Sequence, residues 1–517
     1  MADRRQAALT EEEPTGITLA VQSAFTKLKN LYRETEPIFR SYGFTDPSTE
    51  ISAFLWRLNL YRRATTILVP GLLTLHFPKI ARFVAPIEAR GCESGARTVL
   101  IVSYYAPPWP SNLGTQRAAK FAKYLSAAGW KVLFVTTTPQ TDNEIDEHCE
   151  AIAEAVEVVH VEPGSRHPFH RPGLLPPDDY VFDIPRLADA IARIVSGRSV
   201  DAILATIPPY SVAVAAALVA VRTGVPLVTD FRDPWTKIDR GLGWTLPNSF
   251  LRAISAALER GVLAISSRVI MTSERRYFDD YFPEGSQWGL PKTVSIRNGF
   301  DDDDFVADVE ASNDVIAGAR ADAFVISYVG SLYNGENVDN IRRMFEAFAS
   351  RHPVAGRRVR FQYAGAQGTL LHRRGPWPIP LTDHGFVTHG QSNSLRMRSH
   401  VQLFALPGTF GAHISTGKIF EMIRVGVPIL AIARARSAVS RLVAQTRTGV
   451  TFSPDESDKA ADALKRMFDE WETNHRVSFD PDLGRIQAYS RKSLCGQLSA
   501  VLAAVTGRPT DGSRSAA

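Results

Sequence analysis

The chain has 517 residues, which is too many for one ordinary domain and predicts two or three. Hydrophobic residues make up 44% and charged residues 22%, without any low-complexity tract, so the composition is that of a soluble globular protein. The net charge of +5 is small for this length; it excludes a nucleic-acid-binding signature and mildly favours anionic lipid or phosphorylated substrates.

The cysteines and the N-terminus bear on the cellular compartment. Three cysteines, Cys92, Cys149 and Cys495, are widely separated, which argues against a disulfide framework and indicates a reducing, cytoplasmic compartment. The first residues lack the apolar core of a signal peptide. The longest uncharged stretch near them, 64–78, is too short to span a bilayer, and we expect no transmembrane helix.

Residues 1–96 form an extension whose pattern differs from the rest of the chain. Residues 16–42 predict an amphipathic helix, and 51–83 are rich in apolar and aromatic residues among basic ones. One interpretation is a patch that rests on an anionic membrane, which would make the protein peripheral at the inner face of the cell membrane. The other is a helical cap packed on the first domain, and the sequence leaves both open.

From residue 97 onward, short apolar strands alternate with helices. Strands that are apolar throughout and alternate with helices predict a parallel sheet covered on both faces. In the first half we expect strands at 99–103, 131–136, 202–206, 226–229, 269–272 and 293–296, and helices at 116–128, 211–222 and 248–264.

A turn at Asn298-Gly299 and a run of acids at 301–304 separate this half from a second one with the same alternation. We interpret the acids as a solvated linker and hinge, and not as a metal site. The second half predicts strands at 324–329, 359–364, 401–405, 428–432 and 449–452, and helices at 338–350, 416–425 and 457–470.

The predicted fold class is therefore α/β, with two tandem Rossmann-like doubly wound domains that face each other across a cleft. Ligands in such folds bind at the carboxyl ends of the strands. The first domain is expected at 97–299 and the second at 300–475. We expect a last helical stretch at 476–505 to pack back across the junction, followed by a disordered tail at 506–517.

The loop after the first strand is a candidate anion site. It leads through Gly114 and Thr115 into a helix whose backbone N–H groups suit an anion, and Arg117 in the first turn is placed to hold an acceptor phosphate. The alternative is that Gly114 only supplies a turn and that Arg117 is a surface charge. No dinucleotide fingerprint and no Walker lysine occur there, which argues against a dinucleotide enzyme or a nucleotide triphosphatase.

Asp230, Arg232 and Asp233 follow directly on another predicted strand, where the cleft should lie. One carboxylate is placed to take a proton from an acceptor hydroxyl or to hold Arg232 against a phosphate, which makes these three the candidate catalytic residues. The alternative is a structural Arg–Asp pair that caps the next helix.

The most informative stretch is 415–429. Thr416 and Gly417 open a helix whose free N–H groups and dipole suit a phosphate, and Lys418 and Glu421 share one face of it. Glu421 is placed to accept hydrogen bonds from the hydroxyls of a sugar. The alternative is an intrahelical ion pair between the two charges. Because a lysine at a helix start is unfavourable without an anion, the layout favours a nucleotide-sugar site.

Four segments, 104–125, 205–235, 294–305 and 416–432, together resemble the GT-B-fold glycosyltransferases of the family-4 kind, the retaining enzymes that build bacterial polysaccharides and glycolipids. The resemblance spans 97–470. It implies transfer of a sugar from a nucleoside-diphosphate sugar, of uridine or guanosine, to a cell-envelope glycan or a lipid-linked acceptor. The first domain then holds the acceptor and the second the donor, and no metal or other cofactor is expected.

The resemblance also implies specific donor contacts in the second domain. Gly330 and Ser331 then approach the diphosphate, while Phe386 and Val387 contact the base. Glu421 matches the second glutamate of the family's E-x7-E motif, which holds the ribose.

The chain departs from the family pattern at two places. His413 stands where the first glutamate of the motif is expected, and Ser331 and Asn334 replace the usual arginine and lysine after the glycine. Either Lys418 restores the missing charge or the donor site is weakened. The alternatives are therefore a non-catalytic GT-B-like binding subunit, or a nucleotide-sugar epimerase with the same fold.

Overall fold

The computed structural model describes residues 88–89, 95–105, 115–138, 156–164, 176–237, 249–282, 287–305 and 323–507. The chain divides into two compact units, Met1–Pro70 and Gly71–Ala517, and all of these residues belong to the second. The predicted helix at 16–42, the basic and apolar segment at 51–83 and the tail after residue 507 lie outside the described residues, as does Gly114. Among the described helices, none is long and apolar enough to cross a membrane.

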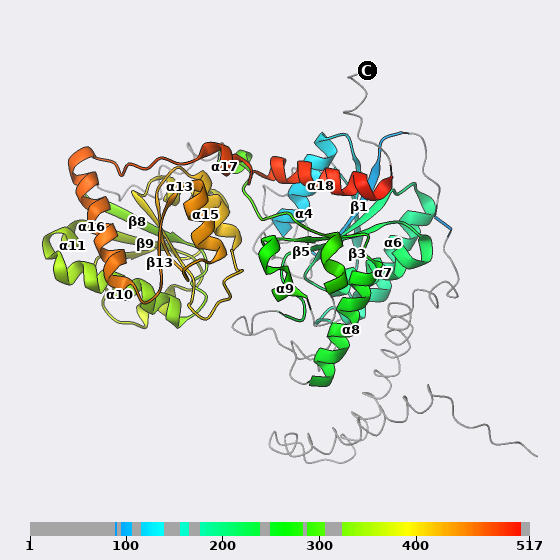
Figure 1. Ribbon diagram of the computed structural model, residues 1–517, viewed down its shortest axis with the longest axis horizontal. Coiled ribbons are helices and arrows are strands. Elements are labelled where there is room, and N and C mark those ends of the chain that lie inside the picture. Colours follow the sequence, from blue (N-terminus) through cyan, green and yellow to red (C-terminus); the bar gives the residue numbers. More distant parts are fainter. Residues whose placement is uncertain are drawn as a thin grey trace, which may run out of the picture. The chain divides into compact units, whose positions relative to one another are not determined.

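The first sheet contains seven strands in the order β3-β2-β1-β4-β5-β6-β7, all parallel (Figure 1). Strands β1 and β4 are buried at all six of their positions, so helices must cover both faces of the sheet. Val99 of β1 lies opposite Val132 on one side and Ala202 on the other. The strands are β1 (Thr98–Ser103), β2 (Lys131–Thr137), β3 (Glu157–Val161), β4 (Ala202–Ile207), β5 (Leu227–Phe231), β6 (Arg268–Met271) and β7 (Thr293–Ser295).

The helices of this first domain connect the strands and pack on the sheet. Nine of the 13 residues of α7 are buried, because most of the helix is Ala and Val. It ends at Gly224, whose φ of +74° is the left-handed conformation that glycine adopts without strain. The helices are α4 (Thr115–Ala127), α6 (Ile184–Gly197), α7 (Ser211–Thr223), α8 (Ser249–Ile265) and α9 (Phe278–Tyr281), with 3-10 turns at Val181–Asp183, Arg275–Tyr277 and Gln287–Lys292.

Helix α18 (Arg491–Thr506) comes from the far end of the chain but completes the core of the first domain (Figure 1). Its side chains Leu494, Cys495 and Leu498 are buried in one cluster with Phe121 of α4. The sequence predicted a single helical stretch over 476–505, whereas the structure has two helices there, α17 (Leu483–Gln487) and α18. Ser490 separates them, and its hydroxyl caps α18 by accepting the N–H of Ser493.

The second sheet contains six parallel strands in the order β10-β9-β8-β11-β12-β13 (Figure 1). Its strands are β8 (Phe324–Val329), β9 (Val359–Ala364), β10 (Leu381–Asp383), β11 (Val401–Ala405), β12 (Ile429–Ile432) and β13 (Gly449–Phe452). Its helices are α10 (Gly335–Arg351), α11 (Pro353–Arg358), α12 (Gly368–His372), α13 (His389–Met397), α14 (Gly417–Arg424), α15 (Ala438–Thr446), α16 (Ser457–Asn474) and α17 (Leu483–Gln487).

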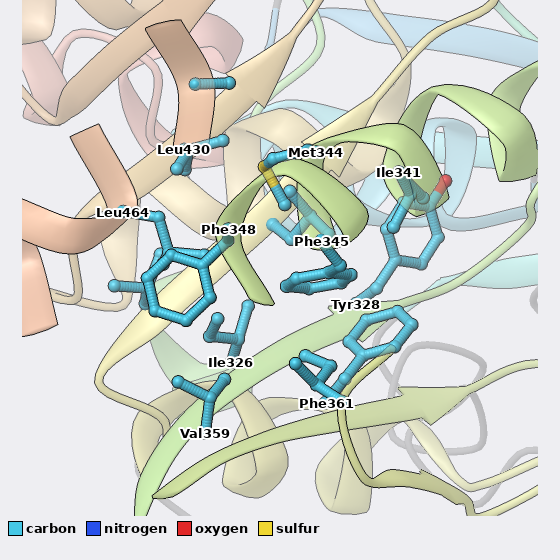
Figure 2. Packing of buried hydrophobic residues seen from close by; sticks show 14 of the residues in the cluster. Ile326, Tyr328, Ile341, Met344, Phe345, Phe348, Val359, Phe361, Leu430 and Leu464 are labelled. Atoms are coloured by element: carbon cyan, nitrogen blue, oxygen red, sulfur yellow. The ribbon is translucent and has the colours of Figure 1, made fainter. Parts of the chain in front are cut away.

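Aromatic and aliphatic side chains pack together in the core under α10 (Figure 2). Phe345 and Phe348 of this helix pack on Ile326 of β8 and Phe361 of β9, all of them almost fully buried. Helix α10 starts where it does because the side chain of Asn334 accepts the N–H of Asn337 at 3.1 Å. The two tandem parallel α/β sheets confirm the predicted fold class.

The acidic run between the domains differs from its prediction as a solvated linker. Asp301 is 2% exposed, and its carboxylate pairs with Lys120 at 2.6 Å and accepts the Tyr124 hydroxyl at 2.5 Å. Burial raises the pKa of Asp301, but Lys120 and Tyr124 outweigh it and bring the pKa to about 2. The interpretation is wrong for Asp301, because three α4 side chains, Lys120, Lys123 and Tyr124, bind this carboxylate. It holds for Asp303, whose side chain is exposed.

Candidate functional site

The loop after β8 approaches the start of α14 closely. Gly330 has a φ of +110°, and a Cβ atom built there would lie 3.4 Å from Cδ of Lys418. The backbone conformation and the close approach both favour glycine at this position. The structure thus brings Gly330, Ser331 and Lys418 together, as the sequence predicted, although they are almost 90 residues apart.

Thr416 is the N-cap of helix α14, and its extended φ and ψ of −72° and 159° are typical of that position. The side chain of Thr416 does not cap the helix, and the first turn contains no acidic residue. First-turn N–H groups have no intrahelical acceptor, and the helix dipole makes this end positive. The start of α14 therefore suits an anion, and it lies beside the Gly330 loop.

Lys418 lies among aromatic rings. Its Nζ atom donates to the Tyr328 hydroxyl at 2.8 Å and to the Ser331 carbonyl at 2.9 Å. The same atom lies 4.3 Å from the ring centroid of Tyr328, 4.8 Å from that of Tyr333 and 5.3 Å from that of Phe404. Burial, and then the charge of Arg396, lower the pKa of Lys418. No ion pair of the described residues includes this ammonium group, so its charge is open to a ligand.

Glu421 is held by two residues of α13. Its Oε2 atom accepts from Nη1 of Arg396 at 2.9 Å, and its Oε1 atom lies 3.2 Å from Nε2 of His389. Burial raises the pKa of Glu421, but Arg396 and His389 outweigh it and lower the pKa to about 2. The alternative of an intrahelical Lys418–Glu421 ion pair is wrong, because each side chain binds other partners. Each carboxylate oxygen keeps a lone pair, and the side chain is 26% exposed.

In the first domain, Arg117 and Asp230 form a buried ion pair. Nε and Nη2 of the guanidinium each donate to one carboxylate oxygen at 2.8 Å, and the side chains are 2% and 0% exposed. Arg117 also donates to the carbonyls of Ile296 and Arg297. The pair therefore ties α4 to β5 and to the chain after β7.

Comparison with known proteins agrees with this architecture. Residues 114–277 match the family model of the glycosyl transferase 4-like domain. Sucrose-phosphate synthase from Thermosynechococcus elongatus superposes with a TM-score of 0.53 at 16% identity, covering 80% of this chain and 99% of its own. The fold is that of the GT-B glycosyltransferases.

Two further GT-B structures give the same result. A glycosyltransferase from Rickettsia africae has a TM-score of 0.52 at 14% identity and covers 79% of this chain and 98% of its own. Trehalose-6-phosphate synthase from Burkholderia multivorans has a TM-score of 0.53 at 13% identity, with 80% and 99% covered. These identities establish the fold alone. No curated protein matches the chain significantly.

Within the GT-B fold, the predicted acceptor residue Arg117 and the predicted catalytic residue Asp230 bind each other. Because each of these side chains occupies the other, the structure shows them as a buried ion pair, and their assignment to acceptor binding and catalysis stays a prediction. Arg232 donates to the carbonyls of Ile207 and Pro208, while Asp233 is exposed. Thr115 is fully buried.

Two predicted base contacts lie beyond β10. Phe386 is 75% exposed, whereas Val387 packs against a small cluster of Val329, Ala364 and Leu395. An exposed aromatic ring beside the carboxyl ends of β8 and β9 suits stacking on a planar ligand. The assignment of these two residues to a base stays a prediction.

His413, which replaces a glutamate of the family motif, packs edge-on against Tyr277 with ring centroids 6.1 Å apart. Close to it, Arg297 donates to the Ser415 hydroxyl at 3.1 Å and pairs with Glu274 at 3.2 Å. Sequence analysis did not single out Arg297. It brings a guanidinium to the residue just before the N-cap of α14, near the place where the chain lacks the usual charges.

Sequence analysis also missed Arg396, whose side chain is almost fully buried and joins Asn393 to Glu421. Helix α13 carries it, and the start of this helix has a visible signature. Thr388 and Gln391 form a capping box, in which each side chain bonds to the other's backbone N–H. That T-x-x-Q spacing predicts the helix but not the partner of Arg396.

Proposed function

We propose that this chain is a glycosyltransferase that moves a sugar from a nucleoside-diphosphate sugar to a cell-envelope polysaccharide or a lipid-linked acceptor. The observation that carries the proposal is the cluster of Gly330, the start of α14 and Lys418. Three features together suit a diphosphate: the glycine backbone, the helix N-terminus, and an ammonium group that has no carboxylate partner among the described residues.

In this proposal the second domain supplies charge stabilisation and orientation. The developing charge on the diphosphate leaving group is stabilised by the first-turn N–H groups of α14 and by Lys418, and we propose that no metal ion is needed. Glu421 stays ionised because of Arg396 and His389, and its remaining lone pairs accept hydrogen bonds from ribose hydroxyls. Thr416 and Gly417 position the backbone at the start of α14, and Phe386 stacks on the base of the nucleotide.

The acceptor binds at the first domain, where we propose fewer candidate catalytic residues than the sequence suggested. Asp233 and Arg232 remain candidates at the carboxyl end of β5, since Asp230 is committed to Arg117. Retention of configuration and action at the cytoplasmic face of a membrane rest on the family resemblance and on the segment at 51–83. A non-catalytic GT-B-like binding subunit is the second candidate, because His413 and Ser331 replace charged residues of the family pattern.

Calorimetric titration with uridine and guanosine diphosphates tests the donor site. Wild-type protein should bind one of them, and Lys418→Ala should weaken that binding about tenfold or more while leaving the parent nucleoside unaffected. Lys459→Ala is the matched control, because Lys459 is an exposed lysine of the same domain paired only with Glu456. Absence of binding to either nucleotide would remove the donor site, and binding without sugar transfer would favour the binding subunit.

A further inference from the structure

Arg491, the first residue of α18, is a buried arginine without a counter-ion in the described part of the chain. It is 8% exposed, and its Nη1 atom is shut off from solvent and has no hydrogen-bond partner among the described residues. Burying a guanidinium that is neither paired nor hydrogen-bonded is costly, so such groups usually have an anionic partner. The proposed mechanism does not use this residue.

The backbone fixes where Arg491 lies. The backbone N–H of Arg491 donates to the Phe300 carbonyl at 2.7 Å, and the N–H of Phe300 donates to the Tyr489 carbonyl at 3.2 Å. A side chain at Gly299 would collide with the Tyr489 carbonyl, since a Cβ there would lie 2.0 Å from that oxygen. The two segments are therefore in direct contact.

The same contacts place Arg491 beside α14. The ring of Tyr489, two residues earlier, packs on Phe420 with centroids 5.4 Å apart, and Phe420 directly precedes Glu421. Burial and the charge of Arg117 lower the pKa of Arg491 to about 10, against the opposing effect of Glu421, Asp304 and Asp230. The guanidinium is thus charged at neutral pH and lies within electrostatic reach of the donor-site glutamate.

Each carboxylate that acts on Arg491 already has a basic partner at 2.7–2.9 Å: Asp230 has Arg117, Glu421 has Arg396, and Asp304 has Lys120. None of the three forms an ion pair with Arg491 in the described part of the chain. Its buried Nη1 donor is therefore left for an anionic ligand.

We propose that Arg491 binds a phosphate group of a substrate, on the Glu421 side of α14. This inference rests on the proposed function and adds a phosphate ligand from a helix that belongs to the core of the first domain. The phosphate has two possible sources with the same chemistry: the diphosphate of the donor, or the phosphate of a prenyl-phosphate-type acceptor.

The test compares Arg491→Gln with Lys492→Gln, which removes a charge from the exposed neighbouring position of the same helix. Calorimetry measures the affinity of each variant and of the wild type for uridine diphosphate and uridine, and for farnesyl phosphate and farnesol. We expect Arg491→Gln to weaken at least one phosphate-bearing probe about tenfold, with the phosphate-free probes unchanged. We expect Lys492→Gln to match the wild type.

The outcomes separate the sources and the proposals. A loss with uridine diphosphate assigns the donor, and a loss with farnesyl phosphate alone assigns the acceptor. Equal affinities in wild type and Arg491→Gln, or no binding of either phosphate by the wild type, overturn the inference. If Lys418→Ala loses uridine diphosphate and Arg491→Gln does not, the proposed function stands without this residue. Should Arg491→Gln fail to fold, Arg491→Lys keeps the charge but not the two-pronged geometry, and unchanged affinity there overturns the inference equally.

Discussion

Replacing Asp230 by asparagine is expected to destabilise the first domain and not to remove a catalytic base. Removing one partner of a buried ion pair costs about 3–5 kcal/mol, because the other charge stays buried without its counter-ion. The two hydrogen bonds between Arg117 and Asp230 are both 2.8 Å long, and both side chains are buried. Asparagine keeps one acceptor oxygen. We therefore expect Asp230→Asn to lower the free energy of unfolding by about 3 kcal/mol, at the low end of this range.

Arg117→Met should lower the free energy of unfolding by more than Asp230→Asn does. It leaves the carboxylate of Asp230 unpaired and also removes the donors to the carbonyls of Ile296 and Arg297, so about 5 kcal/mol is expected. The double variant Arg117→Met/Asp230→Leu removes both charges, and its cost should be smaller than the sum of the single costs by at least about 1 kcal/mol.

Urea unfolding followed by circular dichroism and tryptophan fluorescence measures these free energies. Asp233→Asn is the matched control, since its exposed side chain should change stability by less than about 0.5 kcal/mol. If Asp230→Asn unfolds at the wild-type urea concentration but has lost activity, Asp230 acts on the substrate and the structural account of the pair is wrong.

Three further predictions concern the donor side. Glu421→Gln should weaken nucleoside-diphosphate binding about ten- to a hundredfold in calorimetric titration, and unchanged affinity in a folded variant would take α14 out of the site. Burial lowers the pKa of His389, but Glu421 outweighs it and raises the pKa above the usual value. The stabilisation from protonated His389 is therefore fully present below about pH 6.5 and is lost as the pH rises through the folded-state pKa. His389→Gln should abolish this part of the pH dependence of urea unfolding, and an unaltered profile would contradict the His389–Glu421 contact. Sugar transfer should continue in excess chelator; activity that is lost there and restored by magnesium or manganese would refute the metal-independent mechanism.

The sequence predicted the central strands well because burial on both faces gives an uninterrupted apolar signal. Strands β8, β9 and β11 have the predicted boundaries to the residue. Strands β3 and β10 were missed, and both lie at an edge of their sheet. Their residues are largely half-exposed or exposed and include Glu157, His160 and Asp383, so they carry no continuous apolar run.

Apart from Gly330 and Ser331, which the family resemblance placed at the diphosphate, the site was predictable only where its residues are close in sequence. Thr416, Gly417, Lys418 and Glu421 lie within six residues, and a helix start with two charges on one face can be recognised from such spacing. The partners of those charges cannot, because Arg396 and Tyr328 come from other elements and no pattern links them to α14. The same holds for Arg117 and Asp230, which are 113 positions apart.

The position of α18 means that the first domain is not a continuous stretch of sequence. Its core contains Leu498 and Leu502 from the end of the chain, so a fragment that stops before residue 491 lacks part of a hydrophobic core formed far upstream. The second domain is in effect an insert, and its entry and exit meet where Phe300 pairs with Ser490. Residues 301–489 could therefore be exchanged as a cassette between chains of this architecture, whereas cutting the protein after residue 299 would not liberate a stable half.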